Sequence, residues 1–288
     1  MPHINIHQLK AGGKSLEMVL YRQYGAEGLC YISKLPPTEE TVALGDYPSK
    51  LQALQPVELS RIGMLTGHMF FGIHACFSEP SRYISMLRKP SERLVSYYFY
   101  LLDSPDLAVG RMLRETKMSL EEFVLLGPDD FDRLDLPGHA REQLSFMLEN
   151  GQSKFISGLN PPLGASTREL YETALANMKD HFACVGLTER FDESLVLFKQ
   201  KLDWRIPLFY TRANVTREHP ARTRLSAGVL AVIRERNRFD VKLYKRVRRM
   251  FEREVAGQRR FIRIELAKLS RNNLLFGGYL RLRRLIKR

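Results

Sequence analysis

The chain has 288 residues and a formal net charge of +13, which fits one large globular domain with a core of full size and excludes disorder as the default state. The excess charge lies at the C-terminal end, because residues 245–288 contain fifteen Lys or Arg and only three Glu. A segment with a net charge of +12 attracts polyanions such as nucleic acid, anionic lipid or an acidic polysaccharide, unless it is simply a solvated helix face.

The three cysteines, Cys30, Cys76 and Cys184, are odd in number and include no Cys-x-x-Cys pair. This pattern argues against a disulfide framework and against structural zinc. The sequence has no run of about 18 apolar residues, and its start lacks the charged-then-apolar pattern of a secretory leader. We therefore expect a cytoplasmic location, with peripheral contact to a membrane left open.

The first predicted unit is a strand, a glycine loop and a helix. Residues 4–9 alternate between apolar and polar side chains, as a strand does. Residues 10–15 read Lys-Ala-Gly-Gly-Lys-Ser, and apolar side chains then recur at helical spacing from residue 16 to residue 24.

The glycine loop has the composition of a phosphate-binding site. Gly12 and Gly13 allow backbone N–H groups to turn toward an anion at a helix N-terminus. Lys10, Lys14 and Ser15 add two positive charges and a hydroxyl donor. The alternative is a plain tight turn. The P-loop of a nucleoside triphosphatase would require a glycine at position 8. This chain has glutamine there, so the motif is not present.

A second strand–turn–helix unit follows. The predicted elements are a short strand at 29–33, a proline-rich loop at 35–55, a short helix at 58–65, a strand or loop at 66–77, a buried strand at 82–87 and a helix from 91 to 103. Pro90 suits the first position of that last helix. Arg88 lies at the carboxyl end of a predicted strand, where open α/β sheets bind ligands. Arg88 and Ser96 could together grip a phosphate, although Arg88 could instead pair with Glu92 or an aspartate.

The rest of the chain predicts further alternation of helices and strands. The expected elements are helices at 118–126, 141–149 and 166–180, a buried strand at 183–187, a helix to 202, a basic loop at 211–224, and helices from 226 to about 269 with a break near 236. We predict an α/β fold, with a P-loop-like central parallel sheet flanked by helices. We place a catalytic domain at residues 1–256 and a basic, amphipathic helical extension at residues 257–288.

Several segments, in this order along the chain, resemble motifs of the sulfotransferase superfamily that uses 3′-phosphoadenosine-5′-phosphosulfate. The similarity points to the branch of heparan sulfate 2-O-sulfotransferase and of bacterial carbohydrate sulfotransferases. The segments are residues 7–16 (HQLKAGGKSL), 67–68 (GH), 88–98 (RKPSERLVSYY), 152–158 (QSKFISG) and 185–194 (VGLTERFDES). Two departures from the usual pattern are Leu9, in place of proline, and Lys14, in place of threonine.

The resemblance implies roles for individual residues. The 5′-phosphosulfate would be held by Lys10, Gly12, Gly13, Lys14 and Ser15, with Lys10 stabilising charge on the bridging oxygen. The 3′-phosphate would be held by Arg88 and Ser96. His68 would be the general base that accepts the proton of the acceptor hydroxyl. The scheme requires no metal.

Other polar residues are candidates for donor or acceptor contacts. His74 is an alternative to His68 as the base. A metal site made of His68, His74 and Cys76 matches no common zinc spacing. Gln152 and Lys154 lie in the fourth segment, and Arg217 and Arg222 lie in a basic loop that in the family closes over the nucleotide.

These patterns together predict a sulfotransferase that acts on a hydroxyl of an acceptor, and we expect this acceptor to be a carbohydrate or a glycolipid. The basic C-terminus would contact an acidic glycan or a membrane surface, and no nucleic acid partner is expected. One alternative is a P-loop kinase that uses Lys14 and Ser15, although no buried strand ends in a Walker B aspartate. The other is a non-enzymatic protein that binds polyanions.

Overall fold

The computed structural model describes residues 1–35, 47–131, 133–134, 136–211 and 225–286. Five parallel strands form one sheet in the order β2-β3-β1-β4-β5. The strands are β1 (His3–Ile6), β2 (Leu29–Tyr31), β3 (Met64–Gly67), β4 (Arg82–Leu87) and β5 (Phe182–Leu187). The predicted α/β fold with a central parallel sheet flanked by helices is confirmed.

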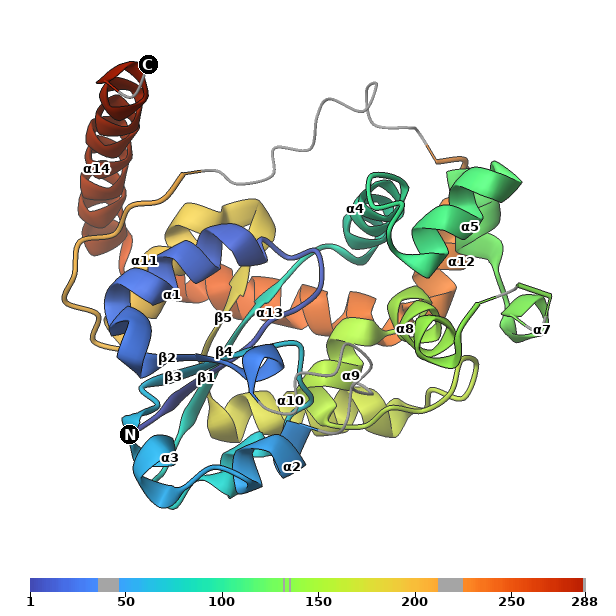
Figure 1. The fold of residues 1–288 in the computed structure, drawn as a ribbon, viewed down its shortest axis with the longest axis horizontal. Helices are drawn as coiled ribbons and strands as arrows, with labels where there is room; N and C mark the ends of the chain where they lie inside the picture. Colours follow the sequence, from blue (N-terminus) through green and yellow to red (C-terminus); the bar gives the residue numbers. More distant parts are fainter. Residues whose placement is uncertain (36–46, 132, 135, 212–224, 287–288) are drawn as a thin grey trace.

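Helices cover both faces of the sheet. Helices α1 and α11 lie on one side, and α2, α3 and α10 lie on the other (Figure 1). The helices are α1 (Gly13–Gly28), α2 (Tyr47–Gln52), α3 (Pro56–Arg61), α4 (Pro90–Leu102), α5 (Ala108–Thr116), α6 (Leu120–Leu125), α7 (Pro128–Phe131), α8 (Gly138–Leu148), α9 (Gly151–Ser157), α10 (Arg168–His181), α11 (Phe191–Lys201), α12 (Ala227–Arg236), α13 (Arg238–Gly257) and α14 (Arg259–Ile286). Short 3-10 turns, η1 (Ile32–Lys34), η2 (Ile73–Cys76) and η3 (Thr188–Arg190), complete the order. Helices α5 and α7 to α9 gather beside the sheet, to the right in Figure 1.

Strand β1 lies at the centre of the sheet and is buried on both faces. Ile4 and Ile6 have no exposed surface, which is the pattern expected for a parallel strand covered on two sides. The polar side chain between them is anchored to the neighbouring strand, because Asn5 Nδ2 donates to Thr66 Oγ1 over 2.8 Å. The chain leaves β1 toward β2 on one side and leaves β4 toward β5 on the other. The crevice between the ends of β1 and β4 is therefore the switch point at which open α/β sheets bind ligands.

The predicted strands at 82–87 and 183–187 are confirmed to within one residue. The helix predicted at 58–65 is wrong at its end, because α3 ends at Arg61 and β3 begins at Met64. A short apolar run does not distinguish a helix from a buried strand. The loop predicted at 35–55 contains α2, and residues 36–46 of it lie outside the described residues. Pro48 stands in the first turn of α2, where its missing N–H costs nothing.

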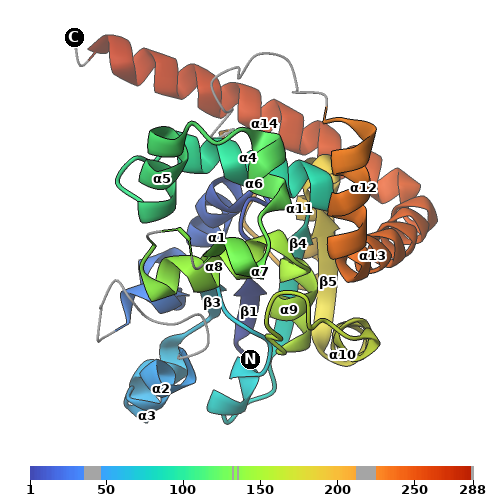
Figure 2. The same ribbon diagram turned by 90° about the vertical axis from the view of Figure 1, so that its right-hand side faces the viewer.

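The predicted break near residue 236 is confirmed between α12 and α13. A second break at Gln258, between α13 and α14, was not predicted. It coincides with the predicted start of the extension at residue 257, although the division into two units stays a prediction. In the described part of the chain, no helix is both long and apolar enough to span a bilayer. Helix α14 runs along one side of the molecule, and its C-terminal part projects beyond the other helices (Figures 1 and 2).

A buried carboxylate joins helices α4, α9 and α13. Asp240 on α13 is 1% exposed, and its oxygens accept the backbone N–H groups of Gln152 at 3.1 Å and Ser153 at 2.7 Å. These donors belong to the first turn of α9, which has no partner for them within the helix. The guanidinium of Arg93, on α4 and also 1% exposed, lies 3.7 Å from the same carboxylate. Asp240 therefore caps one helix and compensates the buried charge of another.

Loss of this carboxylate should destabilise the protein strongly. We expect Asp240→Ala to lower the free energy of unfolding by about 3–5 kcal/mol, because it leaves Arg93 charged, buried and without a counter-ion. Glu252→Ala is the control, since Glu252 pairs with Arg248 at the surface, and surface pairs contribute about 0–1 kcal/mol. Urea denaturation of both variants measures the free energy of unfolding. An equal loss in the two variants would show that the buried pair stabilises the protein no more than the surface pair does.

Candidate functional site

Three neighbouring strands end at the same edge of the sheet, and a polar residue follows each of them. His7 follows β1, His68 follows β3 and Arg88 follows β4. Because the strands are parallel, their carboxyl ends meet. The backbone continues the pairing beyond the strands, with His7 N donating to Gly67 O over 2.9 Å. The residues predicted from separate segments are thus brought to one edge.

The loop after β1 contains two residues in the left-handed backbone conformation, and only one of them is a glycine. Lys10 and Gly12 both adopt positive φ, at 66° and 83°, and this region costs little for glycine and more for lysine. At Gly13 the constraint is spatial, because a Cβ there would lie 1.6 Å from Nε2 of His7. The first turn of α1 therefore packs directly on the imidazole, and no larger residue fits at position 13 without displacing His7.

Positive charge gathers around this loop. Nζ of Lys10 lies 4.1 Å from the centre of the Tyr100 ring, a cation–π contact. The guanidinium of Arg88 donates from Nη1 to the carbonyl oxygen of Lys10 over 3.0 Å. Burial, together with the charges of Arg88 and Lys14, lowers the pKa of Lys10 to about 8, while Asp103 opposes them. A cluster of cations whose mutual repulsion shifts a lysine pKa is a site that an anion would stabilise.

Ser96 and Ser15 lie at the margins of this cluster. Ser96 is one helical turn before Tyr100 on α4, so both side chains share the helix face that meets Lys10. Within the described residues its hydroxyl makes no hydrogen bond, and it remains half-buried. Ser15 is buried in the first turn of α1, where its hydroxyl lies 3.5 Å from the carbonyl oxygen of Thr211.

Gln152 clamps the backbone of Arg88. Its side-chain oxygen accepts the N–H of Arg88 at 2.8 Å, and its Nε2 donates to the carbonyl oxygen of Arg88 at 2.9 Å. The side chain has no exposed surface, and its Nε2 also lies 3.5 Å from Asp240. In this structure Gln152 therefore holds Arg88 at the strand end, and its predicted contact with the donor or acceptor stays a prediction.

The hydrogen bonding of His68 defines its tautomer. Nδ1 lies 2.7 Å from the carbonyl oxygen of His7, and a carbonyl can only accept, so Nδ1 carries the proton and Nε2 has the free lone pair. Burial, followed by the charge of His7, lowers the pKa of His68 well below its usual range. The ring is thus neutral at neutral pH and presents a lone pair at Nε2, but its lowered pKa makes it a weaker proton acceptor than an exposed histidine. The charge of Glu17 raises the pKa of His68 and so opposes this effect.

His7 and Glu17 support this arrangement. The His7 and His68 rings are 4.4 Å apart between centroids, and Nδ1 of His7 is 3.4 Å from Glu17 Oε1. The hydrogen bond from His7 lowers the pKa of Glu17. An ionised Glu17 would in turn stabilise a proton gained by His68.

His74 lies at the opposite edge of the sheet. Its Nδ1 is 2.9 Å from the hydroxyl of Tyr83, near the start of β4, and its ring is 4.8 Å from that of His181, which precedes β5. The structure therefore separates the two candidate bases and places only His68 beside the glycine loop. Among the described residues, no group of three His, Cys, Asp or Glu side chains is arranged to hold a metal ion.

Of the remaining candidates, Lys154 belongs to the described residues. Lys154 is buried in α9, with its Nζ 6.0 Å from the centre of the Phe146 ring. Burial lowers its pKa, and the charges of Glu149 and Asp240 oppose this effect. Arg217 and Arg222 fall outside the described residues.

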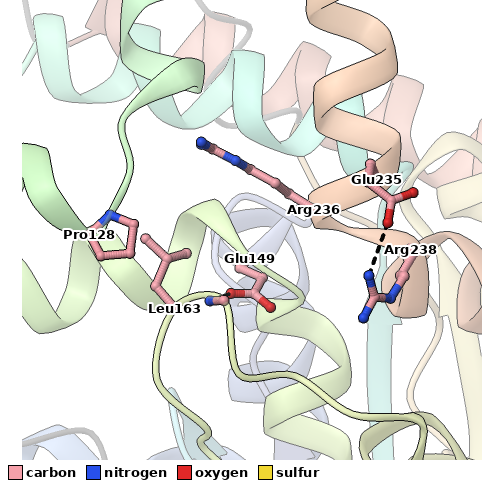
Figure 3. A pocket seen from close by; sticks show the side chains of 7 residues that line it. Pro128, Glu149, Leu163, Glu235, Arg236 and Arg238 are labelled. Atoms are coloured by element: carbon pink, nitrogen blue, oxygen red, sulfur yellow. Dashed lines mark hydrogen bonds and ion pairs between the residues drawn. The ribbon is translucent and has the colours of Figure 1, made fainter.

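A pocket away from the glycine loop has its polar groups already engaged (Figure 3). Its Arg236 donates to the carbonyl oxygens of residues 124–126, at the end of α6. Its Glu149 accepts the N–H of Gly164, and its Glu235 pairs with Arg238 at 2.9 Å. We therefore assign this pocket to the packing of α6, α8 and α12.

Sequence reasoning missed several residues that build the site. Asp240 is 88 positions from Gln152, and no local pattern signals that contact. Arg93 stands in a quoted motif, but its burial follows only from the packing of α4. Glu17 lies one turn into α1, on the face that packs beneath the loop, and this spacing could have indicated it.

Comparison with known proteins gives the family. The sequence matches the galactose-3-O-sulfotransferase family over residues 4–276. It is 30% identical to galactosylceramide sulfotransferase from Bos taurus over 239 residues, which cover 79% of this chain and 53% of that protein. It is 27% identical to heparan sulfate 2-O-sulfotransferase 1 from Gallus gallus over 155 residues, covering 52% and 39%. Galactose-3-O-sulfotransferase 3 from Bos taurus is 26% identical over 179 residues, covering 61% and 39%.

The chain thus spans about half the length, or less, of the curated relatives it matches. The sulfotransferase superfamily is confirmed, whereas the heparan sulfate branch and the bacterial type are not. The predicted cytoplasmic location is wrong, because the similarity to a galactosylceramide sulfotransferase and a galactose-3-O-sulfotransferase contradicts it. That prediction rested on cysteine usage and on the absence of a leader, which do not determine location. The extent and order of the match show that the chain belongs to the galactose-3-O-sulfotransferase family.

Proposed function

We propose that the protein transfers a sulfuryl group from 3′-phosphoadenosine-5′-phosphosulfate to a hydroxyl of a carbohydrate or glycolipid. The observation that carries this proposal is the gathering of Lys10, Lys14 and Arg88 around a glycine loop at the switch point of the sheet. Anionic groups bind where backbone N–H groups, a helix N-terminus and cations converge.

The residues fit the two ends of such a donor. Gly12 and Gly13 pack on Phe191 and His7, and the backbone N–H groups of this loop at the start of α1 suit the 5′-phosphosulfate. Arg88, fixed by Gln152, and Ser96, on the face of α4 that meets Lys10, suit the 3′-phosphate. Lys10 would stabilise the charge that develops on the bridging oxygen as the S–O bond breaks.

His68 suits the acceptor side of the reaction. Its Nε2 lone pair would take the proton of the attacking hydroxyl, and Nδ1 remains bonded to the carbonyl of His7 throughout. Sulfuryl transfer resembles phosphoryl transfer, in which positioning and charge stabilisation supply most of the catalysis. The proposed mechanism therefore needs no covalent step at a protein side chain.

The acceptor class comes from the relatives. Two of them are named for galactose-containing acceptors and one for heparan sulfate. A hydroxyl of a galactose residue, on a glycolipid or a glycan, is therefore the acceptor that we propose first.

The kinase alternative has less support. Arg88 follows β4 and Thr188 follows β5, so neither strand supplies the aspartate that would hold magnesium in a P-loop enzyme. A protein that only binds polyanions would not need the tautomer of His68 or the close packing at Gly13.

Replacing the two proposed catalytic residues should abolish turnover. We expect Lys10→Ala and His68→Asn each to reduce the rate of sulfuryl transfer about a hundredfold or more, because each removes a group that acts on the transition state. Transfer of labelled sulfate to a galactosyl acceptor measures the rate. Lys179→Ala and His139→Asn are matched controls, since both residues are exposed on helices away from the loop. Near-normal turnover in Lys10→Ala and His68→Asn would contradict the catalytic roles proposed for these two residues.

Donor binding should weaken at alkaline pH. Lys10 is protonated below its pKa of about 8 and neutral above it, and only the charged form attracts the donor phosphates. The affinity for adenosine 3′,5′-bisphosphate should therefore be full near pH 7 and about tenfold weaker by pH 9, a loss that follows from the titration of one group. Lys10→Arg should remove this dependence, because arginine stays charged. A wild-type affinity that is flat across this range would contradict the role given to Lys10.

A further inference from the structure

One side of helix α14 packs against the body of the protein, and the other side is exposed to solvent. Its inner side is anchored by the buried residues Ile262 and Leu269 and by polar contacts. Glu265 pairs with Lys199 at 2.7 Å, and Asn272 Nδ2 donates to the carbonyl oxygen of Leu208 at 3.1 Å. These contacts hold the helix against α11 and the segment that follows it.

The exposed surface of α14 combines apolar and cationic side chains. We call it the outer face, and its residues recur at helical spacing: Arg260, Phe261, Ile264, Arg271, Leu275 and Tyr279. All six are exposed, Leu275 by 65% and Tyr279 by 55%. Exposed apolar side chains that are aligned along a helix, and not scattered, mark a surface that binds something.

The positive charge of this region is not compensated. All three acidic residues of the segment 245–288 already have partners: Glu252 pairs with Arg248, Glu254 with Lys201, and Glu265 with both Lys199 and Lys268. Arg260 and Arg271 make no ion pair with any residue that the structure describes. The cationic side chains of the outer face are therefore available to an external partner.

We propose that the outer face of α14 docks onto the surface of an anionic lipid bilayer. A bilayer interface accepts apolar side chains among its acyl chains and cations among its headgroups, which matches both components of the face. A soluble polyanion would satisfy the arginines and leave the leucine and aromatic side chains in water. A second copy of the chain, packed face to face, would bring arginines against arginines.

One short segment connects this helix to the glycine loop. The N–H of Tyr210 donates to Asn273 Oδ1 on α14 at 2.8 Å, and the Tyr210 ring packs 5.0 Å from that of Phe191. Phe191 in turn lies 3.1 Å from the point where a Cβ on Gly12 would stand. A membrane-docked α14 would thus hold the donor loop close to a lipid-borne acceptor. This last consequence rests on the proposed function, whereas the docking itself does not.

The test is co-sedimentation of the full chain with large vesicles. We expect binding to phosphatidylcholine vesicles that contain about 30% phosphatidylserine, and at least about tenfold weaker binding to phosphatidylcholine alone, since each basic residue near an anionic surface contributes roughly a fivefold factor. Leu275→Ser with Tyr279→Ser should weaken binding about tenfold or more. Arg260→Gln with Arg271→Gln should weaken it to a similar extent and reduce its salt dependence. Val57→Ser with Tyr21→Ser, at similarly exposed apolar sites outside α14, is the matched control and should bind as the wild type does.

Three outcomes would overturn the proposal. Unchanged vesicle binding in the serine pair would show that the apolar side chains are not inserted. Binding to a soluble sulfated polysaccharide, with none to vesicles, would assign the arginines to a glycan. A wild-type dimer in sedimentation equilibrium that the serine pair dissociates would assign the face to a second copy. Circular dichroism confirms that each variant is folded, and because the assay needs no turnover, its failure is separate from a failure of the proposed function.

Discussion

The candidate site depends on one buried carboxylate. Asp240 caps the first turn of α9, compensates the buried guanidinium of Arg93 and lies beside the Gln152 amide that fixes Arg88. A charge in the protein interior is stable only when its partners satisfy it. The packing of three helices therefore contributes to holding Arg88 at the end of β4. The same interaction serves stability and the geometry of the site.

A second constraint acts on the other side of the crevice. Gly13 packs on the ring of His7, whose backbone carbonyl holds His68 in the tautomer that can accept a proton. The loop that would bind the donor and the base that would activate the acceptor are thus built around a single residue at the end of β1. This arrangement links the two halves of the proposed reaction, and it explains why a small residue is needed where the helix begins.

Much of this could be predicted from sequence, and the rest could not for physical reasons. The strands at 82–87 and 183–187, the glycine loop and the order of the motifs are local features, and they determine the sheet edge at which Lys10, His68 and Arg88 meet. The choice between His68 and His74 required the strand register, because only the fold shows that they lie at opposite edges. Long-range contacts such as Asp240 with Gln152 leave no periodic signal. The predicted location was wrong because it rested on the cysteine pattern and on the absence of a leader. Neither of these features determines where a protein acts.

The C-terminal helix shows the same limit in another form. Its charge is evident from the sequence, but charge alone does not distinguish a solvated face from a binding surface. The structure adds that the acidic residues of the segment are already paired and that exposed apolar side chains lie beside arginines that have no ion pair among the described residues. Those two facts favour a partner that is both apolar and anionic.

The central claim is that this crevice binds a nucleotide with a 3′-phosphate, and calorimetric titration with adenosine 3′,5′-bisphosphate tests it most directly. We predict micromolar affinity, corresponding to about −8 kcal/mol, with much weaker binding of AMP and ATP. Arg88→Ala should abolish the preference for the 3′-phosphate, while Arg82→Ala, at the opposite end of the same strand, should leave it intact. Equal binding of AMP, or no binding of the bisphosphate, would contradict the account.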